Sequence, residues 1–203
     1  MSELPAISVY LDGERLATVN TDGFDVISVH VHGTKTDAEF ATLEMSGGCY
    51  PEIGESTHLI WIDSQTLIHG QLVEIRFEDE GETNPPGKTI DQLFPDEDKE
   101  AEPEPSDFNP PAAMFADLRA KPQIRHGFAF QLSSSSGANF VGSTANSDHG
   151  FGFSVIWNSQ RPSRAGYSLH AYTLDELESR SAMRDYLREY IQYPSSVTLR
   201  VED

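Results

Sequence analysis

The sequence predicts a mainly β protein with minor α: an antiparallel β-sandwich or small barrel with one C-terminal amphipathic helix packed on the sheet. Three observations support this fold class. Short segments alternate apolar and polar residues with the period of a strand. Two pairs, Asp12-Gly13 and Asp22-Gly23, separate such segments as tight hairpin turns do. A capping box near the C-terminus opens a helix with an apolar stripe.

The N-terminal half, residues 1–80, is predicted to form six short antiparallel strands. Because the Asp-Gly turns join the first three in succession, we expect those three to be neighbours in one sheet. In the last of the six, Val73, Ile75 and Phe77 alternate with polar residues, which is typical of a strand with one buried face. The expected strands are 7–11, 16–20, 26–32, 39–45, 57–63 and 71–77.

Residues 81–111 differ abruptly in composition, since prolines and carboxylates replace the alternating pattern. Like charges and the fixed φ angle of proline favour an extended acidic connector between two halves. The alternative is a long insertion draped across the sheet, in which Ile90, Leu93, Phe94 and Phe108 serve as apolar anchors.

The C-terminal half, residues 112–203, is predicted as a second β half that either has its own core or shares one with the first. A short helix is expected at 112–120, and a longer one near 173–192. Thr173 and Glu176 form the capping box of the longer helix, and Leu177 belongs to its apolar stripe. The expected strands are 127–132, 139–141, 151–157, 167–172 and 197–201.

The charge of the chain limits its partners. Asp and Glu total 33 against 14 Lys and Arg, which gives a formal net charge of −19. Nucleic acids and anionic membranes repel such a surface, whereas a basic protein is attracted to it. The single cysteine, Cys49, and the lack of an apolar signal or membrane span lead us to expect a cytoplasmic protein.

One histidine pair could bind a metal. On a strand, His30 and His32 place both imidazoles on one face, and two such side chains can hold a transition metal if further ligands arrive from elsewhere. His58, His69, His126, His149, His170 or a carboxylate could supply them. The alternative is that both are solvated strand residues, in which case no cofactor is expected.

Three functions are compatible with these features. The chain has no recognisable nucleophile or phosphate-binding motif, so the first interpretation is a non-enzymatic acidic binding protein that captures a basic partner, as immunity proteins, antitoxins and inhibitors do. Its expected partner-binding residues are Asp96, Glu97, Asp98 and Glu100. The alternatives are a metal-dependent enzyme that uses His30 and His32, and an assembly component of a phage or secretion apparatus.

Overall fold

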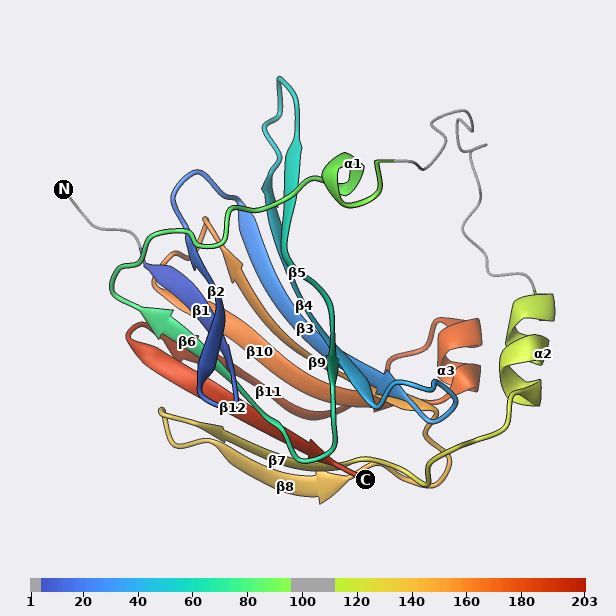
Figure 1. Cartoon of the computed structure of the whole chain (residues 1–203). Coiled ribbons are helices and arrows are strands. Elements are labelled where there is room, and N and C mark those ends of the chain that lie inside the picture. Colours follow the sequence, from blue (N-terminus) through green and yellow to red (C-terminus); the bar gives the residue numbers. More distant parts are fainter. Residues whose placement is uncertain (1–4, 96–111) are drawn as a thin grey trace.

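The computed structural model of the chain describes residues 5–95 and 112–203. Within these residues, twelve strands form two antiparallel sheets of six strands each, and the sheets do not close into a barrel (Figure 1). The predicted mainly β, antiparallel fold is confirmed, and of the two architectures expected the chain adopts the one with two separate sheets.

Sheet A contains the strands nearest both ends of the chain, and sheet B contains most of the longer strands. In spatial order, sheet A consists of β2 (Glu14–Asn20), β1 (Ala6–Leu11), β6 (Leu72–Glu78), β12 (Ser195–Glu202), β7 (Ala129–Ser134) and β8 (Asn139–Ser143). Sheet B consists of β11 (Arg184–Gln192), β10 (Arg164–Tyr172), β9 (Gly150–Asn158), β3 (Val26–Thr34), β4 (Ala41–Cys49) and β5 (Thr57–Leu67). The helices are α1 (Ile90–Leu93), α2 (Ala112–Ala120) and α3 (Leu174–Ser179).

A single hydrophobic core lies between the sheets. Alternate residues of most strands point into it, and large aromatic side chains such as Phe77, Phe153 and Trp157 are almost completely buried there. The core draws on both sides of segment 96–111, because β3 pairs with β9 and β6 pairs with β12. Burial of apolar surface on both inner faces therefore holds the two sheets together.

The first Asp-Gly pair forms the expected hairpin, but the second does not. Asp12 and Gly13 both have positive φ, 51° and 84°, and they join β1 to β2 in one antiparallel pair. After Asp22-Gly23, however, the chain crosses to sheet B, so the prediction of three neighbouring strands is wrong. An alternating pattern shows which face of a strand is buried, but both sheets offer an equivalent buried face.

The helix predicted near 173–192 is also wrong beyond its first turns. Its capping box is present: the Thr173 amide donates to the Glu176 carboxylate at 2.7 Å, and the Glu176 amide donates to the Thr173 hydroxyl at 3.1 Å. Arg180 then takes a left-handed conformation, φ 53°, which ends α3. The chain continues as β11, because pairing with β10 outweighs a weak helical preference.

Residues 79–95 form a strap across one side of the two sheets. The backbones of Asn84 and Thr18 of β2 exchange two hydrogen bonds of 2.9 Å, and those of Lys88 and Ile60 of β5 exchange bonds of 2.8 and 2.9 Å. The strap thus connects an edge of sheet A to an edge of sheet B (Figure 1). Ile90 and Phe94 are exposed and do not anchor it, and Phe108 lies outside the described residues.

A buried polar network closes one end of the molecule. Lys35 is fully buried, and its ammonium donates to the carbonyl oxygens of Ala145 and Asn146 at 3.1 and 3.0 Å. The buried Asp148 accepts from the Ala145 amide at 2.6 Å and forms an ion pair with Arg184. Burial lowers the pKa of Lys35, and the nearby Asp148 carboxylate opposes that shift, so the carboxylate stabilises the buried cation.

Two of the helices lie side by side at the end of sheet B. Arg119 of α2 forms ion pairs of 2.6 Å with Asp175 and Glu178, which belong to α3 (Figure 1). The helix predicted at 112–120 is confirmed by α2. None of the helices in the described residues has the length and apolar character needed to cross a membrane.

Candidate functional site on the outer face of sheet B

The outer face of sheet B, the side turned away from the core, has a floor of small residues. Ser28 of β3 and Ser46 of β4 face each other with their hydroxyl oxygens 3.5 Å apart, and Ser154 and Ser168 do so on β9 and β10 at 3.1 Å. Gly152 and Gly166 extend this floor. Small side chains leave the face open, so larger neighbours can lean across it.

Larger polar side chains surround one end of this floor and form a depression with a volume of about 270 Å³. His30 of β3 lies directly beside Glu44 of β4 in the strand register, and His32 lies opposite Gly152 of β9, which in turn lies opposite His170 of β10. Four side chains from three strands, those of His30, His32, Glu44 and His170, therefore lie on one surface. We call it the histidine depression, and its members are His30, His32, Glu44, Gly152, Ser154, His170 and Tyr172.

Two glycines of β9 make room for the side chains of β10. A Cβ atom on Gly152 would stand 2.6 Å from Nε2 of His170, and one on Gly150 would stand 2.6 Å from the hydroxyl of Tyr172. Both distances are too short for real contacts, so the rings of His170 and Tyr172 occupy the space that side chains on β9 would fill. The Gly-Phe-Gly sequence thus determines how far these rings reach over the face.

Replacing Gly152 with alanine is expected to displace His170 from the depression, because the new methyl group would overlap its ring. A displaced imidazole is better solvated, so its pKa should rise toward the ordinary value of about 6.5. The pH titration of the His170 resonances by NMR measures this. Gly166→Ala is the matched control, because its methyl group would meet Tyr190 at an ordinary 3.5 Å. Equal titration in both variants would contradict the proposed packing.

Burial keeps the central histidines uncharged near neutral pH. It lowers the pKa of His30, and the charge of His32 adds to this while the Glu44 carboxylate opposes it. Burial likewise lowers the pKa of His170, where Asp185 opposes the shift and Arg188 and His30 add to it. Neutral imidazoles have a ring nitrogen that accepts hydrogen bonds. The pKa of Tyr172 is raised to about 12, mainly by burial, so its hydroxyl stays protonated.

Glu44 is a half-buried carboxylate without a cationic partner. No lysine or arginine in the described parts of the chain forms an ion pair with it, and its one hydrogen-bond donor among these residues is the Ser64 hydroxyl, at 3.5 Å. By contrast, Asp148 is paired with Arg184. A second depression of about 220 Å³ continues past His32 to Asp37, Glu39 and Thr42. Acceptors and carboxylates therefore dominate this end of the face.

The histidines predicted as metal ligands reach this site. His30 is half-buried and His32 exposed, and both point outward from β3. Among the residues that the structure describes, no three His, Cys, Asp or Glu side chains form a group able to hold a metal ion. The metal site therefore stays a prediction. His149 is buried in the end network, and His69 accepts a hydrogen bond from the Asp203 amide at 2.9 Å.

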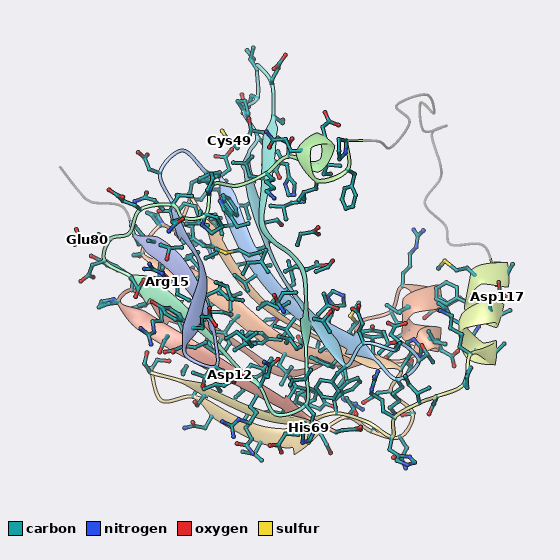
Figure 2. All side chains as sticks on the ribbon, in the orientation of Figure 1. Asp12, Arg15, Cys49, His69, Glu80 and Asp117 are labelled. Carbon is teal, nitrogen blue, oxygen red and sulfur yellow. The ribbon has the colours of Figure 1, made fainter. Side chains whose placement is uncertain are left out.

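Cys49 lies away from the histidine depression. Burial and the neighbouring Asp25 carboxylate both raise the pKa of its thiol, and a raised pKa disfavours the nucleophilic thiolate. Cys49 and His69 lie at opposite ends of the strands (Figure 2). The thiol therefore has the electrostatic surroundings of a structural cysteine.

Acidic side chains are distributed around the molecule. Glu80 lies near one end of sheet A, Asp12 near the other, and Asp117 on α2 (Figure 2). The predicted partner-binding residues lie outside the described residues; they are Asp96, Glu97, Asp98 and Glu100. Sequence reasoning named His170 only as one of several possible further ligands, and it missed Glu44 and Tyr172 as members of a site. Their outward positions follow from strand alternation, but their proximity depends on the order of strands in the sheet.

Comparisons with known proteins add no relative. No protein-family model, no curated protein and no solved structure matches the chain. The functional proposal therefore rests on the contacts, burial and charges of the described residues.

Proposed function

We propose that this chain is a non-enzymatic binding protein that captures a basic protein partner and holds a cationic part of it on the outer face of sheet B. One observation carries the proposal: the half-buried Glu44 carboxylate has no cationic partner among the described residues and faces acceptor groups in the histidine depression. A carboxylate held partly out of water gains most from an incoming cation.

The rest of the protein favours the approach of such a partner. The net charge of −19 creates a negative field that raises the rate at which basic proteins are encountered. Close contact then depends on local acceptors, and neutral imidazoles next to a carboxylate provide them without competing positive charge. The field and the depression thus support two successive steps of one association.

Affinity capture from the source cells, with the full chain as bait, tests the proposal. The bait is compared with Glu44→Gln, which removes the carboxylate and keeps the shape of the side chain. Glu14→Gln is the matched control, because it changes the net charge equally at the exposed start of β2 in sheet A. We expect a basic protein to be retained at low salt, weakened at high salt, and bound at least about tenfold more weakly by Glu44→Gln alone.

Two results would overturn the proposal. The first is that no basic protein is retained at low salt. The second is that Glu44→Gln and Glu14→Gln bind the captured protein equally well, since binding would then depend on total charge and not on the depression.

A further inference from the structure

We infer that the histidine depression binds an arginine side chain of the partner. The inference rests on the proposed function and deepens it, because it names the group that is bound. Its evidence is the arrangement of acceptors around Glu44.

The acceptors have the geometry that a guanidinium needs. Glu44 and His30 are direct neighbours across β4 and β3, Ser154 lies beside His30 on β9, and His170 leans over Gly152 from β10. A guanidinium has five N–H donors in one plane, so it can bind a carboxylate through two of them and still donate to neighbouring oxygen or nitrogen atoms. Its flat face can also stack on aromatic rings such as Tyr172.

The depression is large enough for one side chain and too small for a larger group. About 270 Å³ accommodates a guanidinium and part of its aliphatic stem, and the floor of serine and glycine lets it approach the sheet. The neighbouring depression with Asp37 and Glu39 offers carboxylates to a second donor of the same partner. A lysine ammonium is a compact point charge and cannot use the spread of acceptors equally well.

The experiment uses the full chain and two probes, N-acetyl-arginine amide and N-acetyl-lysine amide, followed by NMR of the histidine resonances. At about pH 7.5 the arginine probe should shift the resonances of His30 and His170 and bind more tightly than the lysine probe. Glu44→Gln should weaken it at least about tenfold, and Glu14→Gln should not.

The possible failures are distinguishable. If a basic partner is captured but the arginine probe does not shift the resonances of His30 or His170, the arginine site is overturned and the proposed function is left intact. Equal binding of the lysine probe overturns the selection of arginine. Failure of the partner capture itself overturns the proposed function.

Discussion

Replacing Asp148 with alanine is expected to lower the free energy of unfolding by about 3 to 5 kcal/mol. The Asp148 side chain is 2% exposed, and it serves Arg184, the Ala145 amide and the Tyr186 hydroxyl together. Its removal would leave the fully buried Lys35 without a nearby negative charge. An uncompensated buried charge is far costlier than a lost contact at the surface.

Urea unfolding followed by circular dichroism measures the effect of Asp148→Ala. Asp175→Ala is the matched control, because Asp175 is also an ion-pair carboxylate but its side chain is 87% exposed. Solvent screens such a pair, so the midpoint of unfolding should hardly change in the control. Similar midpoints for the two variants would show that the end network does not depend on Asp148.

Replacing Trp157 with alanine is expected to cost about 3 to 5 kcal/mol of stability, because it removes one of the largest buried side chains and leaves a cavity between the sheets. The Trp157 indole N–H also donates to the Pro162 carbonyl at 3.1 Å, and that bond is lost. Few other single changes to the core remove as much buried apolar surface.

The neighbouring residue gives the control for this prediction. Ile156 points to the outer face of sheet B and is 42% exposed, so Ile156→Ala should cost much less than Trp157→Ala. Both free energies come from the same urea titrations. If the order of the two costs were reversed, the inward and outward faces of β9 would be wrongly assigned.

Local patterns in the sequence predicted most strands. Alternation of apolar and polar residues indicates a strand with one buried face, and the structure confirms that burial. Val73, Ile75 and Phe77 are buried in β6, as their spacing indicates. The Asp12-Gly13 turn and the Thr173 capping box were predictable for a similar reason, since each depends on side chains within a few residues of one another.

Features that depend on distant segments were not predictable. Residues 184–192 carry apolar side chains at helical spacing, yet an available edge of β10 makes them a strand. The strand expected at 39–45 stops before Gly47 and Gly48, but both glycines lie inside β4. A Cβ atom on Gly47 would stand 2.6 Å from the Val26 carbonyl oxygen, so glycine permits close approach of β3 there.

Only the part of the candidate site that lies on a single strand could be predicted from the sequence. His30 and His32 share a face because of the period of one strand, and that much is local. His170 and Glu44 join them through the order β10-β9-β3-β4, which brings together residues separated by long stretches of sequence. Histidines and carboxylates at many other positions look equivalent until that order is known.

The shared core has a consequence for how the molecule forms. β3 acquires its neighbour β9, and β6 its neighbour β12, only after more than half of the chain has been synthesised. Until then β3 has only β4 and β6 has only β1 as a neighbour, so one edge of each strand stays unpaired as the chain leaves the ribosome. Pairing between remote segments is slow, so we expect folding to be mainly post-translational and sensitive to chaperones that shield those strands.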